Sequence, residues 1–454
     1  MWRKLLLTVA TLTVLVSAAA SENPPAARRV LVKYSINEND PKQLEEKVTI
    51  PLERILRKLE RVTESHSMTT HGLVQIELSF KNGATEDDRA TVTKFVEPLE
   101  IDKALRIISR SITLVPARLP GEFDQANQLA RQSIQTIMQD QRIPGLQIAV
   151  VKNDNVVFSE SYGLANIENN VPASRWIRFP LNSATKAFTG VAVMQLVEAG
   201  LVDLDAPLSQ YLEDLPQAWR DIRVRQLLAH TSGLPDIVDP QGAPNGGNEA
   251  AAWQAARAQA VNAPAGEAFS YNQTNYALLA QIISKQGKMP YDRFIAERQF
   301  AIAGMHWATF GDSYDLVSNA ATIYAHTTRG LSHWFYEIPH GLWAGGGIQT
   351  TADEVAQWLV ALSKGRLISQ ASIRRMWTAE KLNNGKDGEW GGGWPVLQTT
   401  PELQVAGIGG ARAAFIVYPE QKLAIVVLTN LAGAHPQRFI PQIAEFYKNA
   451  NQDH

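Results

Sequence analysis

Apolar and polar residues alternate strictly along residues 74–80, and this period of two predicts a strand with one buried face. Upstream, apolar residues recur every three or four positions from Leu44 to Leu59, which predicts an amphipathic helix that Pro51 kinks. Further elements are expected as a strand at 29–36, a polar helix from about Thr85 and a strand at 112–115.

The resulting order of strand, helix, strand, strand, helix, strand is typical of a ferredoxin-like domain, which we place at residues 28–118. Within it, residues 48–53, 59–62 and 72–76 resemble the porter subdomain of resistance-nodulation-division efflux pumps. The resemblance implies a docking or assembly module that contacts a protein partner. A stabilising appendage is the alternative interpretation, because the region carries no catalytic group.

The pattern changes after a linker at 116–121. A helix is expected at 123–138, then a hairpin of strands at 147–152 and 156–162, and a helix at 187–199 that is apolar nearly all round. A closing strand is expected at 423–429. Together these elements predict a second domain at 122–448, so the fold class is α+β.

The first 20 residues have the three parts of a secretory signal. Arg3 and Lys4 precede an apolar run, and small residues follow it up to Ala20. The run is shorter than the ~20 residues needed to span a bilayer. We therefore expect cleavage near Ala20, a mature chain without a membrane span, and a periplasmic or secreted location.

Composition narrows the chemistry further. The 454 residues carry a net charge of -2, which gives no basic face for nucleic acid, and 45% of them are hydrophobic, as in a globular protein. The absence of cysteine excludes disulfides, a thiol nucleophile, cysteine-bound zinc and a lipoprotein anchor. No histidine pair has zincin spacing and no phosphate-binding loop occurs, so neither a metal nor a cofactor is expected.

The candidate nucleophile is Ser183, at the head of the apolar helix. Lys186 follows three positions later, so the two side chains share a helix face. An amine among apolar neighbours is pushed towards its basic form and could accept the serine proton. By itself the pair also fits an N-cap serine followed by a solvent-seeking lysine, so the surrounding sequence has to decide.

Two segments downstream supply that context. Residues 201–208 and 225–235, the latter ending in His230-Thr-Ser-Gly-Leu-Pro235, follow the helix in an order that resembles the serine β-lactamase superfamily. The resemblance covers roughly 123–447, in the branch with class C β-lactamases, penicillin-binding-protein-like DD-peptidases and esterases. It implies an antiparallel sheet flanked by helices and a helical lobe, with Ser183 and Lys186 as the catalytic pair.

The same resemblance assigns a proton shuttle. Tyr271 falls in the family's Tyr-x-Asn frame after Pro264-Ala-Gly266, and its alternative role is that of a packed aromatic. The motif asparagine is replaced by Gln273, whose amide could orient Lys186 or a substrate carbonyl. The position of His230 in its motif indicates a packing residue beside the site rather than a base.

The family's Lys/His-x-Gly motif is altered. Gly407 stands where the cation belongs, Gly409 stands at the motif glycine, and Gly410 and Ala411 follow on what we expect to be a strand with the second oxyanion donor. Arg412 either replaces the cation or is a surface residue. A Gly345-Gly346-Gly347 segment resembles the family's structural turn before a helix.

The sequence therefore predicts an exported serine hydrolase. Its Ser183 attacks an ester or amide, in a small molecule or a peptide, and becomes acylated. The missing cation favours an esterase- or peptidase-like activity over a true β-lactamase. The alternative is a non-catalytic protein of the same fold that serves as a periplasmic binding or assembly factor.

Overall fold

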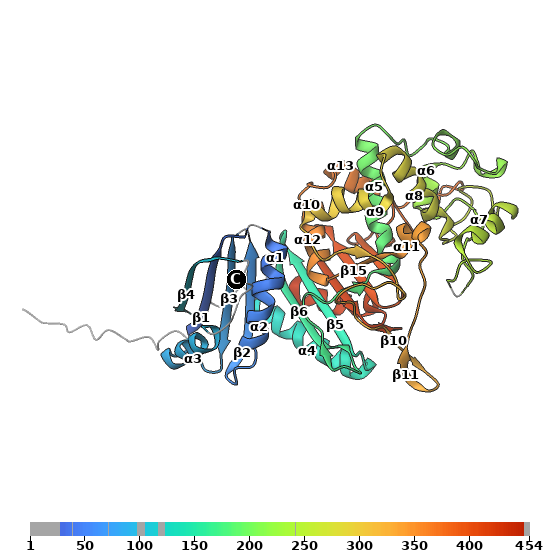
Figure 1. The fold of residues 1–454 in the computed structure, drawn as a ribbon. Helices are drawn as coiled ribbons and strands as arrows, with labels where there is room; N and C mark the ends of the chain where they lie inside the picture. Colours follow the sequence, from blue (N-terminus) through green and yellow to red (C-terminus); the bar gives the residue numbers. More distant parts are fainter. Residues whose placement is uncertain are drawn as a thin grey trace, which may run out of the picture. The chain divides into compact units, whose positions relative to one another are not determined.

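The computed structural model describes residues 28–38, 40–70, 72–97, 105–116, 123–240 and 242–448. The predicted signal at 1–20 and the predicted linker beyond Pro116 lie outside these residues. The chain divides into two compact units, with the boundary after Gly121. In Figure 1 the first unit is blue and the second runs from cyan to red.

The first unit contains one antiparallel sheet of four strands in the order β2-β3-β1-β4. Its elements are β1 (Arg28–Ile36), α1 (Pro41–Leu44), a π-helical turn (Glu45–Thr49), α2 (Ile50–Leu56), β2 (Val62–Thr70), β3 (Leu73–Phe80), α3 (Glu86–Val96) and β4 (Ile107–Pro116). The irregularity expected at Pro51 is this π turn, after which the proline occupies the first turn of α2.

The core of the first unit follows from the two periodicities. Alternate residues of β1 and β3 are buried, and they pack against Leu44, Val48, Leu52 and Leu56 at helical spacing. The sequence placed no residues on β2, because this edge strand is polar and is defined by its backbone pairing with β3. Thr85 caps α3 through a reciprocal capping box with Asp88.

The second unit is built on a sheet of seven strands in the order β13-β14-β15-β16-β5-β6-β7. Its strands are β5 (Gly145–Lys152), β6 (Asn155–Asn166), β7 (Val171–Pro172), β13 (Val396–Gln398), β14 (Gln404–Gly409), β15 (Ala413–Tyr418) and β16 (Leu423–Thr429). The early strands β5 and β6 and the late strands β14 to β16 therefore join in one antiparallel sheet.

Helices and short strands make up the rest of this unit. The helices are α4 (Asp124–Gln141), α5 (Thr185–Glu198), α6 (Val224–Leu228), α7 (Glu249–Ala258), α8 (Thr274–Gly287), α9 (Tyr291–Ile295), α10 (Ala301–Ala303), α11 (Trp343–Gly346), α12 (Ala352–Ser363), α13 (Gln370–Met376) and α14 (Ile440–Lys448). The short strands are β8 (Phe179–Pro180), β9 (Thr309–Phe310), β10 (Tyr324–Thr327), β11 (Gly330–His333), β12 (Ile348–Thr350) and β17 (Leu431–Ala432).

Both faces of the central sheet are covered, which explains why β5 is buried along its whole length. Ile148 and Val150 face a core formed with α4 and α14, whereas Ala149 and Val151 face a larger core that includes α5, α8 and α12. In the part of the chain that the structure describes, no helix combines the length and the apolar character needed to cross a membrane.

Helix α5 runs through the larger core and is buried nearly all round. Gly190 allows this packing, because a Cβ at that position would lie 2.1 Å from the carbonyl oxygen of Gly392. The helix thus carries its first turn, including Lys186, into the interior beside the end of β14.

Candidate active site

Ser183 lies in a one-turn 3-10 helix, Asn182–Ala184, between β8 and the start of α5. It is half-buried and lies two residues before Thr185, the first residue of the α-helix that the sequence placed it on. Strand β12 holds the turn from both sides: the Leu181 N–H donates to the Ile348 carbonyl at 2.8 Å, and the Ile348 N–H donates to the Thr185 hydroxyl at 3.2 Å. The nucleophile is therefore fixed by sheet contacts.

The three predicted catalytic side chains converge. Tyr271 Oη donates to Ser183 Oγ at 2.8 Å, and Lys186 Nζ lies 4.8 Å from the centroid of the Tyr271 ring. The direct contact expected between Ser183 and Lys186 is not the one observed, because Lys186 Nζ donates to Gln273 Oε1 at 2.9 Å and to the Gly345 carbonyl at 2.7 Å. Tyr271 thus links serine and lysine.

Lys186 is fully buried, as the sequence predicted for this helix face. Burial lowers the pKa of its amine, while Tyr271 and the Asp236 carboxylate act in the opposite direction. Nζ also lies 4.8 Å and 5.0 Å from the ring centroids of Tyr271 and Tyr276. A buried amine with a lowered pKa gives up its proton more readily than a surface lysine, as a proton acceptor requires.

Gln273 orients Lys186, which was one of its two predicted roles. Because its Oε1 accepts from Lys186 Nζ, its Nε2 is left as the donor end of the amide. The backbone N–H of Gln273 donates to Asp236 Oδ1 at 2.9 Å, and burial raises the pKa of that carboxyl. The sequence did not single out Asp236, although it directly follows the Gly-Leu-Pro segment after His230.

Gly345 is a second residue that the sequence analysis missed, since the Gly345–Gly347 segment was interpreted only as a turn. Its carbonyl binds Lys186, and a Cβ at this position would lie 2.5 Å from Gln273 Oε1 and 3.4 Å from Lys186 Nζ. The glycine is therefore required for the lysine and the glutamine to meet. The run of three glycines was the available signal.

The end of β14 lies against the backbone of the nucleophile. A Cβ on Gly409 would be 1.8 Å from the Leu181 carbonyl oxygen and 2.8 Å from the Ser183 nitrogen. Gly410 and Ala411, expected on a strand, are instead the two central residues of a β-turn, with φ of 56° and 53°, closed by the Arg412 N–H donating to the Gly409 carbonyl at 3.0 Å. The end of β14 and the turn that follows it therefore lie close to the backbone N–H of Ser183.

The place of the family's cation is occupied by an aromatic ring. Gly407 pairs with Phe415 across β14 and β15, and a Cβ on Gly407 would lie 2.2 Å from the Phe415 ring. No side chain of any length fits at Gly407 while Phe415 keeps its position. The loss of the cation is thus built into the sheet packing.

Arg412 is buried, with 3% of its surface exposed, so its interpretation as a surface residue is wrong. Its guanidinium stacks on Tyr336 at 4.8 Å from the ring centroid. Among the residues that the structure describes, Nε and Nη1 have no hydrogen-bond acceptor, and burial lowers the pKa of the group. Nε would lie 2.8 Å from a Cβ on Gly410, which places this cation against the oxyanion turn.

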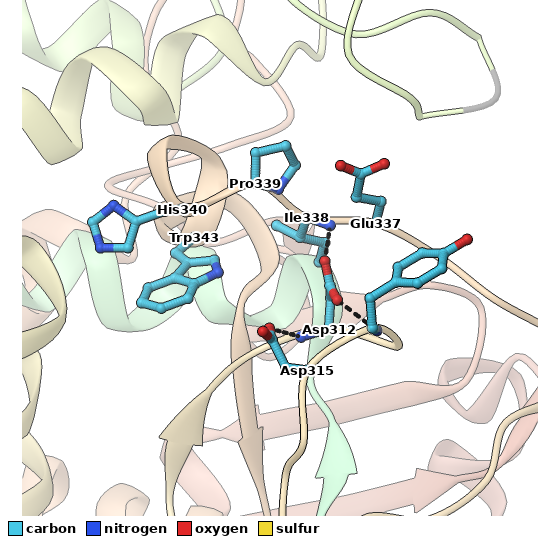
Figure 2. Close-up of a pocket in the computed structure, with 8 residues that line it drawn as sticks. Asp312, Asp315, Glu337, Ile338, Pro339, His340 and Trp343 are labelled. Carbon is cyan, nitrogen blue, oxygen red and sulfur yellow. Dashed lines mark hydrogen bonds between the residues drawn. The ribbon is translucent and has the colours of Figure 1, made fainter. Parts of the chain in front are cut away.

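A pocket of about 410 Å³ adjoins the site. It is lined by Asp312, Tyr314, Asp315, Glu337, Ile338, Pro339, His340 and Trp343. Figure 2 shows that Asp312 binds two loops together, since its carboxylate accepts from the N–H groups of Tyr314 and Ile338. Ile338 and the Asn182 backbone both lie within 4 Å of the Cβ position of Gly346, so the lining reaches the nucleophile turn.

Across the described ranges, no group of three or more histidine, aspartate or glutamate side chains is placed to hold a metal ion. The site is instead made of a hydroxyl, a phenol, an amine and backbone N–H groups, which is the set of groups that acyl transfer uses.

Comparison with known proteins agrees with this geometry. The family model described as Beta-lactamase matches residues 130–446. Protein flp of Staphylococcus aureus (strain MW2) is 26% identical over 333 residues, covering 70% of this chain and 65% of that protein, so the chain spans a little under two thirds of this relative. Penicillin-binding protein 4* of Bacillus subtilis (strain 168) is 26% identical over 311 residues, covering 62% of this chain and 67% of that protein.

A solved structure shows the same similarity in three dimensions. The octameric penicillin-binding protein homologue from Pyrococcus abyssi superposes with a TM-score of 0.59 at 25% identity, covering 70% of this chain and 76% of that one. The residues that match the family model lie in the second unit, which also contains the site.

The buried His230 gives the fold a measurable pH dependence. Burial, and then the Lys186 charge, hold the pKa of His230 well below its ordinary value of 6.5, so below that pH the unfolded chain binds a proton that the folded protein does not. As the pH is lowered below 6.5, this group should therefore reduce the free energy of unfolding by up to about 1.4 kcal/mol per pH unit. We expect urea unfolding to show a steeper loss between pH 6.5 and 5 for wild type than for H230F. Equal slopes would contradict this, and H230N serves as a second non-titrating variant.

Proposed function

The chain belongs to the beta-lactamase family, and from this premise we propose that it is a serine hydrolase that forms an acyl-enzyme on Ser183. The observation that carries the proposal is the position of Tyr271 between the other two groups: its Oη donates to Ser183 Oγ at 2.8 Å, and its ring centroid lies 4.8 Å from the buried Lys186 amine. A serine hydroxyl becomes an effective nucleophile when its proton has such a route. The substrate is an ester or amide.

The proton route has two steps. In the resting structure Tyr271 donates to Ser183, so the phenol first passes its proton to neutral Lys186 and then takes the serine proton as Oγ attacks the carbonyl carbon. The ammonium formed is held by Gln273 and Gly345. The tetrahedral intermediate collapses as Tyr271 protonates the leaving oxygen or nitrogen, and water releases the acyl group by the reverse route.

The negative charge of the tetrahedral intermediate develops between two backbone segments. The Ser183 N–H and the hairpin turn after Gly409 flank this position, and the close approach of Gly409 to the nucleophile's backbone brings them together. Donors fixed in advance cost no reorganisation when the charge forms. Gln273 Nε2 is available to hold a substrate carbonyl.

The buried cation of Arg412 favours a substrate that carries an anionic group. No cation fits at Gly407, but the buried guanidinium of Arg412 lies beside Gly410, and its Nε and Nη1 have no acceptor among the described residues. An unpaired buried charge is costly, and a carboxylate that reached it would form a charge-assisted hydrogen bond. The 410 Å³ pocket offers room for the rest of the ligand.

The alternative function is that of a non-catalytic binding or assembly protein. Two altered motifs, Gln273 for asparagine and Gly407 for the cation, favour it. The buried Lys186 opposes it, because a binding protein gains nothing from an amine held at that depth. A labelling experiment separates the two.

The remaining parts of the proposal concern location and the first unit. The signal at 1–20 supports export, and the antiparallel sheet order β2-β3-β1-β4 supports a ferredoxin-like, porter-like module that contacts a protein partner. Ile108 on edge strand β4 is 67% exposed and marks one accessible face of that module.

Acylation of Ser183 can be tested by intact mass. The protein should gain an acyl mass from an activated ester, a penicillin or a fluorophosphonate, and S183A should gain none. Removing the proton route in Y271F or K186M should slow acylation by about 10² or more. S284A, on α8, should label like wild type. A folded wild-type protein that reacts with no probe would favour the binding function.

The role of Arg412 can be tested with two esters that differ in one charge, p-nitrophenyl butyrate and p-nitrophenyl hemisuccinate. Charge-assisted hydrogen bonds contribute about 1.5–3 kcal/mol, so R412Q should lose roughly tenfold or more in kcat/KM on the succinate ester relative to the butyrate ester. R412K should retain part of the preference. Equal losses on both esters, at unchanged melting temperature, would refute the assignment.

Export and partner contact are tested in cells. The envelope fraction of a bacterial host should yield a protein whose mass lacks the residues up to about Ala20, and an intact mass with the apolar run present would refute the signal assignment. A photo-crosslinker at Ile108 should capture a defined partner in the source organism, whereas one at exposed Leu201 of the second unit should not.

A further inference from the structure

Tyr271 lies in an irregular segment, residues 269–273, just before α8. No regular secondary structure fixes its backbone, and its side chain is 40% exposed. Yet its hydroxyl has to stay within hydrogen-bond reach of Ser183, because a misplacement of 1 Å can cost about 10² in rate. Some other group must hold this segment in place.

His230 contacts the chain on both sides of Tyr271. The N–H of Ser270 donates to the His230 carbonyl oxygen at 2.8 Å, and the N–H of Asn272 donates to His230 Nδ1 at 3.2 Å. The imidazole ring also lies 4.4 Å from the Tyr271 ring centroid, tilted by 35°. One residue therefore holds both neighbours of the tyrosine and supports its ring.

The partners of His230 also fix its protonation. Asn275 Oδ1 accepts from Ser232, so its Nδ2 donates to His230 Nδ1 at 3.1 Å, beside the N–H of Asn272. A nitrogen that accepts two N–H groups carries no proton, so the proton of the neutral ring sits on Nε2. Nε2 is buried and has no acceptor within the described part of the chain.

This arrangement excludes a role for His230 as the base. Protonation would place an Nδ1–H against the Asn272 N–H and break the contact that holds the segment. Among the described residues, Lys186 is the charged group that acts on the ring. Around it pack Tyr271, Tyr276, Phe269 and Trp390, the last edge-to-face at 4.7 Å.

We propose that His230 is the positioning residue for Tyr271: it clamps the backbone at Ser270 and Asn272 and supports the ring, so that Oη stays on the line between Ser183 and Lys186. The inference rests on the proposed function, in which Tyr271 transfers the proton. His230 acts through Tyr271 and exchanges no proton itself. It is therefore distinct from a residue that merely fills the core.

Two variants divide the contacts of His230. H230F keeps an aromatic ring beside Tyr271 but removes the acceptor for Asn272, and H230N keeps an acceptor near the Nδ1 position but removes the ring. Each should lower the acylation rate of Ser183 by about 10–100-fold at saturating ester, with KM changed by less than about threefold. L279A, a cavity variant in the core of α8, is the control for a general loss of packing.

A double-mutant cycle identifies the route of the effect. In a Y271F background H230F should cost less than about twofold, because the residue that it positions is already inactive. A loss that stays 10–100-fold in that background would overturn the proposal. If the wild type is not acylated by any probe, the proposed function fails instead, so the two failures are distinct.

Hydrogen exchange keeps the inference testable if neither variant folds. In the wild-type protein the amides of Ser270 and Asn272 should exchange at least about tenfold more slowly than that of Ala268 on the same loop, because His230 holds them. Exchange of all three amides at the same fast rate would overturn the proposed clamp.

Discussion

The buried amine of Lys186 is the constraint on which the rest of the site depends. An amine without water must find acceptors inside the protein, and its two are the amide oxygen of Gln273 and the carbonyl oxygen of Gly345. Gln273 directly precedes α8 and Gly345 lies in α11. The amine of Lys186 on α5 therefore connects three segments that are far apart in the sequence. The glycine at 345, the amide at 273 and the depth of α5 all follow from satisfying that atom.

Local patterns predicted the candidate catalytic groups because each of them lies in a short motif. The Ser183–Lys186 spacing alone also fitted an N-cap serine, and the resemblance of the downstream segments to the β-lactamase superfamily decided for a catalytic pair with Tyr271. The alternation in β3 and the apolar run of α5 predicted their elements for the same reason. The position of strand β2 was not predicted, because it is set by hydrogen bonds to β3 and not by its own polar residues.

What the sequence could not supply were contacts between distant segments. Whether Arg412 lies at the surface or in the interior depends on Tyr336, which is far away in the chain, and the direct serine–lysine contact gave way to one mediated by Tyr271. A strand was expected at Gly410 and Ala411, but β14 ends at Gly409. The two residues form a turn that the Arg412 N–H closes by donating to the Gly409 carbonyl. Each of these outcomes is decided by packing against a partner that a local pattern does not contain.

The pairing of Gly407 with Phe415 also limits how this site can evolve. A lysine or histidine at 407 clashes with the ring, and Phe415 itself is packed against Trp394 and Trp358. A smaller residue at 415 would have to come first, and alone it leaves a cavity in the core. A cation at position 407 therefore requires two substitutions in a fixed order, the first of them destabilising, and no single mutation introduces it.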